Sequence, residues 1–200
     1  MIETGRLVLR PPRAEEAADA LELLGDPDVA RWNPAPSVVD LDSAAAWSRR
    51  GADWSAGDHA TFSVLDAATG AYLGVVSLHS IDPVQHDAEI GYRVTPRARG
   101  RGVATEAVTA ATAWAFANLA LVRIELAHAV DNPPSCAVAL RAGYPLEGVL
   151  RQSFVYGDGR RYDEHLHARL AGDPPPGRPA AGPAPGSQAA GDADVGAGGV

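Results

Sequence analysis

Apolar and polar residues recur along the chain with two periods, which predict short strands and amphipathic helices. Residues 6–11 (RLVLRP) alternate polar and apolar side chains before a Pro-Pro pair, as expected of a strand with one buried face. Residues 14–24 repeat apolar side chains every three or four positions, which predicts a helix. Further strands are expected at 61–66, 72–78, 87–94, 122–130, 144–153 and 161–170. Further helices are expected at 40–56, with an interruption near Gly51, at 102–119 and at 133–142.

The order of these elements predicts an α/β fold, a mixed sheet with helices on its faces. One strand and two helices come first, followed by three strands, a helix, a strand, a helix and two final strands. We expect a single domain over residues 1–170 of the 200 in the chain. Residues 171–200 hold 8 glycines, 6 prolines and 8 alanines with little to bury, which predicts a disordered tail.

The distribution of charge along the chain indicates which kind of ligand the protein can bind. The chain has a formal net charge of −8, yet residues 91–103 hold Arg93, Arg97, Arg99 and Arg101 and no acid. A local positive patch on an acidic protein indicates a small anionic ligand. A long polyanion such as nucleic acid would be repelled by the rest of the surface, so no nucleic-acid partner is expected.

Composition excludes further classes of function. All 17 cationic residues are arginine, so no lysine Schiff base can form. The single cysteine, Cys136, excludes an intramolecular disulfide. The apolar runs are too short to span a bilayer, and the N-terminal segment MIETGRLVLR lacks the apolar core of a secretory signal. We therefore expect a cytoplasmic protein with no membrane partner.

The segment 97–102 (RARGRG) follows a predicted strand and opens a predicted helix. The first amides of a helix are unpaired and carry partial positive charge, so they bind phosphate. Gly100 and Gly102 can adopt positive φ and let the backbone approach a ligand. An ordinary arginine-rich surface loop is the alternative interpretation. The segment lacks both the GxGxxG of dinucleotide-binding folds and the GK[ST] of P-loops, which disfavours nicotinamide and nucleoside triphosphate ligands.

Five motifs, in order along about residues 3–170, resemble the GNAT family of N-acetyltransferases. They are TGRLVLRP, AEIGYRV, RARGRG, VDNPPSCAVALRAGY and LEGVLRQ…DGRRYDEHLHARL. The set is similar to the RimJ/RimL-like branch, which acetylates the N-termini of ribosomal proteins. The resemblance implies the GNAT fold, with a mixed, mostly antiparallel, seven-stranded sheet that is splayed at its centre. It also implies acetyl-CoA as cosubstrate, no metal, and a homodimer, since relatives are often dimers.

The resemblance further implies that acetyl-CoA binds along the splayed strand and the loop that follows it. The pantetheine arm would pair with the backbone of Arg93, Val94 and Thr95 as an added strand does, and Asn132 would hydrogen-bond the same arm. The diphosphate would lie against the loop and the first helical turn. The residues implied there are Arg97, Arg99, Gly100, Arg101, Gly102, Val103, Ala104 and Thr105.

The implied catalytic residues are Ser135, as the acid that protonates the leaving coenzyme A thiolate, and Glu89, as a base that acts through a water. Each has a simpler interpretation. Asn132 and Pro133 suit the start of a helix whatever Ser135 does, and Glu89 can be an ordinary strand carboxylate. Some relatives use a glutamate as base where this chain has Phe154, so that mechanism does not carry over and the case for a ribosomal acceptor is weaker.

Other reactive side chains are expected to have packing roles. Cys136 lacks a local Cys/His signature, and His165 and His167 share a strand face without spacing that completes a metal site. Trp32 and the loop 26–37 either pack or form a wall of the acceptor pocket. The sequence thus predicts acetyl transfer from acetyl-CoA to a protein N-terminal α-amine or a small-molecule amine, by direct attack in a ternary complex. A non-catalytic acyl-CoA sensor or scaffold is the alternative.

Overall fold

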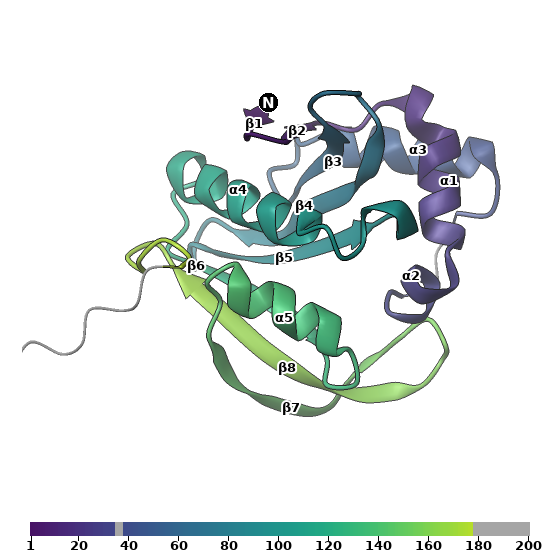
Figure 1. The fold of residues 1–200 in the computed structure, drawn as a ribbon. Helices are drawn as coiled ribbons and strands as arrows, with labels where there is room; N and C mark the ends of the chain where they lie inside the picture. The colour runs from purple at the N-terminus through teal and green to yellow at the C-terminus, as the bar shows by residue number, and fades with distance from the viewer. Residues whose placement is uncertain (35–37, 178–200) are drawn as a thin grey trace, which may run out of the picture.

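One sheet of eight strands organises the protein (Figure 1). The computed structural model describes residues 1–34 and 38–177. The order across the sheet is β1-β2-β3-β4-β5-β6-β8-β7. The strands are β1 (Ile2–Glu3), β2 (Leu7–Arg10), β3 (Ala60–Asp66), β4 (Tyr72–Asp82), β5 (Asp87–Val94), β6 (Arg123–Ala129), β7 (Leu146–Val155) and β8 (Arg161–Leu170). The α-helices are α1 (Ala17–Gly25), α2 (Pro27–Arg31), α3 (Leu41–Ala52), α4 (Val103–Asn118) and α5 (Pro133–Arg141).

The strands and helices expected from the sequence are present, with three differences. β1 pairs with β2 and makes eight strands, where seven were predicted, because two residues are too few to show an alternating pattern. α2 begins where only a helix end was expected, since Asp26 accepts a hydrogen bond from the Val29 amide and Pro27 suits the first helical position. α3 ends at Ala52, so the predicted helix does not continue to residue 56.

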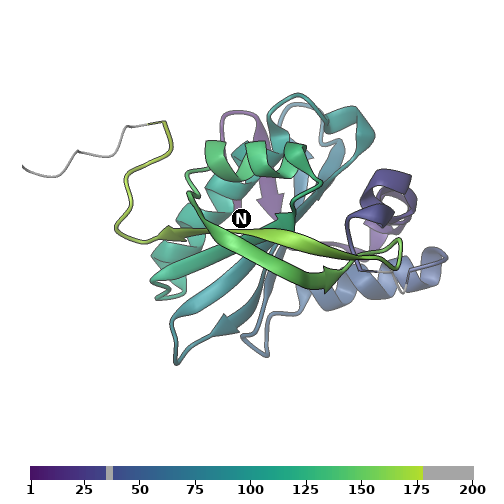
Figure 2. The same ribbon diagram turned by 90° about the horizontal axis from the view of Figure 1, so that it is seen from below.

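Helices cover the two faces of the sheet (Figure 1 and Figure 2). α4 packs on one face through Ala107, Val108, Ala111 and Ala115, all almost completely buried, and small side chains let the helix lie close to the strands. α5 lies beside α4 on that face (Figure 1). α1 and α3 pack together on the opposite face, over a second cluster of buried residues that includes Tyr72 and Val75.

The sheet splits between β5 and β6. This is its parallel pair, and the pairing covers only residues 87–89 against 123–125. Beyond Glu89, β5 pairs with β4 alone, and β6 continues as the partner of β8. The connection through α4 makes the two strands parallel, and their divergence leaves unpaired backbone edges facing a gap. The splayed sheet predicted from the family resemblance is confirmed.

The chain continues past β8 along the body of the domain. Ala171 donates a backbone hydrogen bond to the Val122 carbonyl (3.0 Å), and Asp173 accepts one from the Leu170 amide (2.8 Å). The first seven residues of the predicted tail are therefore placed, while residues 178–200 lie outside the described part. Within residues 1–34 and 38–177, no helix has the length and apolar character needed to cross a membrane.

Candidate active site

The loop between β5 and α4 presents a run of backbone amides. Gly100 and Gly102 both adopt positive φ (71° and 77°), as the sequence predicted, and Gly102 is the N-cap of α4 without a side-chain cap. Among the described residues, the amides of residues 100–105 have no hydrogen-bond acceptor. Six adjacent unpaired donors at the positive end of a 16-residue helix form a site for a phosphate-sized anion.

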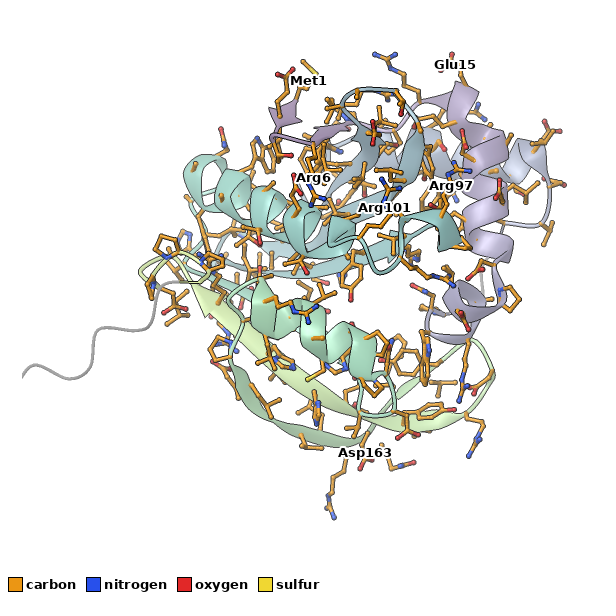
Figure 3. All side chains as sticks on the ribbon, viewed as in Figure 1. Met1, Arg6, Glu15, Arg97, Arg101 and Asp163 are labelled. Atoms are coloured by element: carbon orange, nitrogen blue, oxygen red, sulfur yellow. The ribbon has the colours of Figure 1, made fainter. Side chains whose placement is uncertain are left out.

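The arginines of this loop are not all directed at that site. Arg97 donates to the Tyr72 carbonyl (2.8 Å), and Arg99 pairs with Asp26 and Asp28 beside α2. These two guanidinium groups anchor the loop to the N-terminal helices. Arg101 pairs with no acid within the described residues, and its carbonyl accepts a hydrogen bond from the side chain of Arg6 (3.2 Å). Figure 3 shows Arg6 and Arg101 close together at the start of α4.

The ion pair between Arg99 and Asp26 is largely shielded from solvent. The Asp26 side chain is 13% exposed. Burial alone would raise the pKa of Asp26, but its hydrogen bonds from Arg99 and from the Val29 amide outweigh burial and lower the pKa below its ordinary value. The acidic residue therefore stays ionised, and it fixes the loop relative to α2.

The split in the sheet opens into a cavity of about 600 Å³ that reaches both faces. β4 and β5 line one side of the cavity, and β6 with the start of α5 lines the other. Trp32 and Phe154 also line the cavity. Of the sequence-predicted residues, the structure brings Glu89, Arg93, Asn132 and Ser135 together around this one space.

Ser135 lies in the first turn of α5 and is 9% exposed. Its amide donates to the Asn132 side chain (3.4 Å), so Asn132 caps the helix as expected. Its hydroxyl is 2.9 Å from the hydroxyl of Tyr92, which belongs to β5 on the other side of the split. Burial raises the pKa of Tyr92 to about 12, against a smaller lowering by the bond to Ser135. Sequence reasoning missed Tyr92, although strand alternation places it on the face opposite Glu89.

Glu89 points to the other face of β5, the face covered by α1 and α3. Its side chain is 49% exposed, and Oε2 is 3.9 Å from Nδ1 of His79, the residue directly opposite in β4. Burial lowers the pKa of His79, so this imidazole is neutral at neutral pH. Arg93 follows Glu89 by four residues and lies on the same face of β5. Its side chain is mostly covered, and no acceptor is found for its Nε in the part of the chain that the structure describes.

A second carboxylate and an aromatic group form the wall at β7 and β8. Glu164 is 8% exposed and accepts hydrogen bonds from Tyr156 (2.7 Å) and Ser153 (2.7 Å). Trp32 packs edge-on against Tyr156 and Tyr162, at 5.8 and 5.6 Å between ring centroids. Glu164, Trp32 and Tyr156 all line the cavity. Glu164 was not predicted, although its alternation with Tyr162 in β8 places both on one face.

The remaining reactive side chains lie under α5. Cys136 is partly buried, and His165 and His167 are joined there by His128, which was not predicted. Burial lowers the pKa of both His128 and His167 below the ordinary value for histidine.

The split sheet and the amide-rich helix start define a transferase that uses an acyl-coenzyme A. An unpaired strand edge can pair with an extended ligand such as a pantetheine arm, and unpaired amides at a helix start bind phosphate groups. The model of the acetyltransferase (GNAT) domain matches residues 6–145. The chain belongs to the GNAT family and is an acetyl-CoA-dependent N-acetyltransferase.

Relatives and solved structures agree with this assignment. YoaA of Bacillus subtilis, an uncharacterized N-acetyltransferase, is 27% identical over 177 residues, 84% of this chain and 95% of that protein. The ribosomal-protein-serine acetyltransferase of Escherichia coli is 37% identical over 99 residues, 49% of this chain and 54% of that protein.

Among solved structures, the microcin C7 self-immunity acetyltransferase MccE, in complex with acetyl-CoA and AMP, shares the fold. Its TM-score is 0.76 at 23% identity, over 84% of this chain and 93% of that one. The ribosomal L7/L12 α-N-protein acetyltransferase RimL, in complex with coenzyme A, has a TM-score of 0.75 at 21% identity, over 84% of this chain and 95% of that one. The predicted resemblance to the RimJ/RimL-like branch is confirmed.

Proposed function

We propose that the protein acetylates a primary amine by direct attack on acetyl-CoA within a ternary complex. The observation that carries this proposal is the convergence of Ser135 and Glu89 on one cavity from opposite sides of the split sheet. A thioester in the gap would present its sulfur to the face of α5 and its carbonyl carbon to the face of α1 and α3. Acid and base would then act on different sides of the same reacting group.

The proposed reaction has three parts. The neutral amine nitrogen attacks the thioester carbonyl carbon, and an edge amide between Arg93 and Thr95 stabilises the oxyanion. The carbon–sulfur bond then breaks, and Ser135 protonates the departing thiolate. Glu89 accepts, through a water, the proton that the amine loses. The hydroxyl of Tyr92, 2.9 Å from that of Ser135, can pass a proton to the serine as it takes one from water in the cavity, while Glu89 releases its proton to solvent.

The diphosphate of acetyl-CoA is proposed to bind the amides of Gly100, Arg101, Gly102 and Thr105, together with those of Val103 and Ala104. Arg101 supplies the free guanidinium charge. In this proposal Arg97 and Arg99 act by holding the loop, because their guanidinium groups are bound to α1 and α2. Asn132 and the edge backbone of Val94 bind the pantetheine arm.

The acceptor is proposed to be a cationic amine that becomes neutral readily. Glu89 and Glu164 place two carboxylates on the cavity wall, beside the aromatic faces of Trp32 and Tyr156. A protein α-amine has a pKa of about 8, against about 10.4 for a lysine amine, so a weak base suffices for the former. A peptide N-terminus and a small-molecule amine of similar pKa both satisfy this description, and the homodimer stays a prediction.

The proposal is tested by measuring thiol release from acetyl-CoA with a panel of acceptors. The panel contains peptides with a free N-terminus, the same peptides with a blocked N-terminus and an internal lysine, and small amines with a pKa of about 8. Release with free N-termini or small amines and not with blocked peptides is expected. Tight binding of acetyl-CoA without release on any acceptor would instead favour the sensor or scaffold role.

A further inference from the structure

Three histidines and the single cysteine converge beneath α5, and one of them, His128, also lines the cavity. His128 in β6 lies directly opposite His165 in β8, and His167 follows two residues later on the same face. Cys136 reaches the group from the first turn of α5. One ligand atom from each of the four residues lies within 4.8 Å of the other three. His128 and His167 are 4% and 0% exposed.

The hydrogen bonds of the two most buried rings leave a conflict at the centre of the group. Nδ1 of His167 is 3.0 Å from the Tyr144 carbonyl, and Nδ1 of His128 is 2.8 Å from the Ala129 carbonyl. A carbonyl only accepts, so each Nδ1 carries a hydrogen and each Nε2 has a lone pair. The two Nε2 atoms nevertheless face one another at 3.2 Å. Two lone pairs at that distance repel unless a cation lies between them or a proton is shared.

The hydrogen bonds from Nδ1 to backbone carbonyls are of the kind that prepares an imidazole to bind a metal through Nε2. A ligating histidine commonly donates its second nitrogen to a backbone carbonyl, which fixes the tautomer and the ring orientation. Zinc bonds of about 2.0 to 2.3 Å in a tetrahedron place the ligand atoms roughly 3.3 to 3.7 Å apart. The separation of 3.2 Å between the two Nε2 atoms is close to that spacing. Nδ1 of His165 is also buried and has no partner among the described residues.

We propose that His128, His165, His167 and Cys136 bind one zinc ion that fastens α5 to β6 and β8. Binding replaces the thiol proton of Cys136 with a sulfur–zinc bond and releases that proton to solvent. The ion has no part in acetyl transfer, so this proposal is independent of the proposed function. Its structural effect reaches the active site because Ser135 precedes Cys136 in the first turn of α5.

The test uses the full-length protein without an affinity tag, freed of metal by a chelator. Cobalt(II) is titrated first as a spectroscopic probe and then displaced by zinc. One equivalent of cobalt is expected to give the intense visible bands of a tetrahedral site and a thiolate-to-cobalt charge-transfer band. Zinc should abolish both and should raise the melting temperature of the chelator-treated protein.

Matched variants distinguish this site from adventitious binding. Cys136→Ser should lose the charge-transfer band, and its melting temperature should no longer respond to the chelator. His86→Asn, in the exposed turn between β4 and β5, should behave as wild type. Circular dichroism establishes that each variant is folded. A wild-type protein that binds less than half an equivalent, or a folded Cys136→Ser with an unchanged charge-transfer band, would overturn the proposal. The former result would mean that the two imidazoles share a proton.

Discussion

Replacement of Ser135 by alanine is the most informative single change, because the structure separates its effect on chemistry from its effects on binding and folding. The helix cap survives, since Asn132 accepts from the backbone amide of residue 135 and not from its hydroxyl. The amides proposed to bind the diphosphate lie in the loop before α4 and in the first turn of that helix, so the substitution leaves them unchanged. The variant loses one hydroxyl, and the Tyr92 hydroxyl loses its hydrogen-bond partner at 2.9 Å on the wall of the cavity.

The expected magnitudes differ between stability and turnover. Loss of the hydrogen bond between the partly buried hydroxyls of Tyr92 and Ser135 should cost about 0.5–1.5 kcal/mol of unfolding free energy. Loss of a general acid should lower kcat by about 100-fold or more, which corresponds to about 2.7 kcal/mol or more at 1.36 kcal/mol per tenfold. The Kd for acetyl-CoA, measured by calorimetry, should remain within about twofold of wild type because its main contacts are intact.

The assay measures thiol release with two acetyl donors, acetyl-CoA and an analogue whose thiol is more acidic. A more acidic thiolate needs less protonation as it leaves, so the deficit of Ser135→Ala should be smaller with the analogue. Tyr92→Phe is the companion variant and should lose less activity than Ser135→Ala. Equal deficits with both donors, or wild-type turnover with acetyl-CoA, would remove Ser135 as the acid. A larger loss of activity in Tyr92→Phe than in Ser135→Ala would indicate that the tyrosine is the acid.

Three further predictions concern the base, an ion pair and a close backbone contact. Glu89→Gln should lower kcat by about 100-fold at pH 7, and the deficit should shrink in a pH–rate profile as the amine deprotonates unaided. Asp26→Asn keeps a helix cap but loses the pairing with Arg99, at a cost of about 1 kcal/mol at neutral pH. Because the folded-state pKa of Asp26 is lowered, this contribution is complete above the ordinary value and is lost as pH falls through the folded-state pKa, which urea unfolding across pH would show. Gly157→Ala should cost about 1–3 kcal/mol and lower the melting temperature, because a Cβ there would lie 1.8 Å from the Ala30 carbonyl oxygen.

The two stability predictions each have a control variant nearby in the structure. Asp28→Asn also removes a partner of Arg99, but that side chain is 75% exposed, so the stability should change by less than about 0.5 kcal/mol. A Cβ at Gly148 would meet no atom within 4 Å, so Gly148→Ala should not disturb packing. A Glu89→Gln deficit that is constant with pH would contradict the assignment of a base. Equal losses of stability in Asp26→Asn and Asp28→Asn would contradict the importance of the shielded ion pair. Equal losses in Gly157→Ala and Gly148→Ala would contradict the close contact at Gly157.

The sequence predicts the features of the fold that depend on the pattern of residues that are close together in the chain. Alternation locates the long strands, and the glycines of RARGRG predict the positive φ at residues 100 and 102 because few other residues adopt it. β1 is too short for a pattern. α2 could have been predicted from Asp26 and Pro27, which have the residue types of a helix start.

Contacts between distant segments could not be predicted in this way. Tyr92 and Ser135 are 43 residues apart, and they meet only because β5 and α5 flank the same gap. Arg99 appeared free in the sequence because its acidic partners lie 71 and 73 residues earlier. Glu164 is buried because Tyr156 and Ser153 satisfy its oxygens, and this information lies in the pairing of β7 with β8.

Ordinary sheets expose unpaired backbone only along their two outermost strands, where other chains can attach. Here the parting of β5 from β6 creates two more such edges inside the molecule. An extended ligand that fits this wedge acts as a temporary ninth strand, so its binding should slow hydrogen exchange of the facing amides and make unfolding more cooperative. The pairing of only three residues between β5 and β6 therefore places the proposed ligand site at an interruption in the middle of the sheet, where most sheets are continuous.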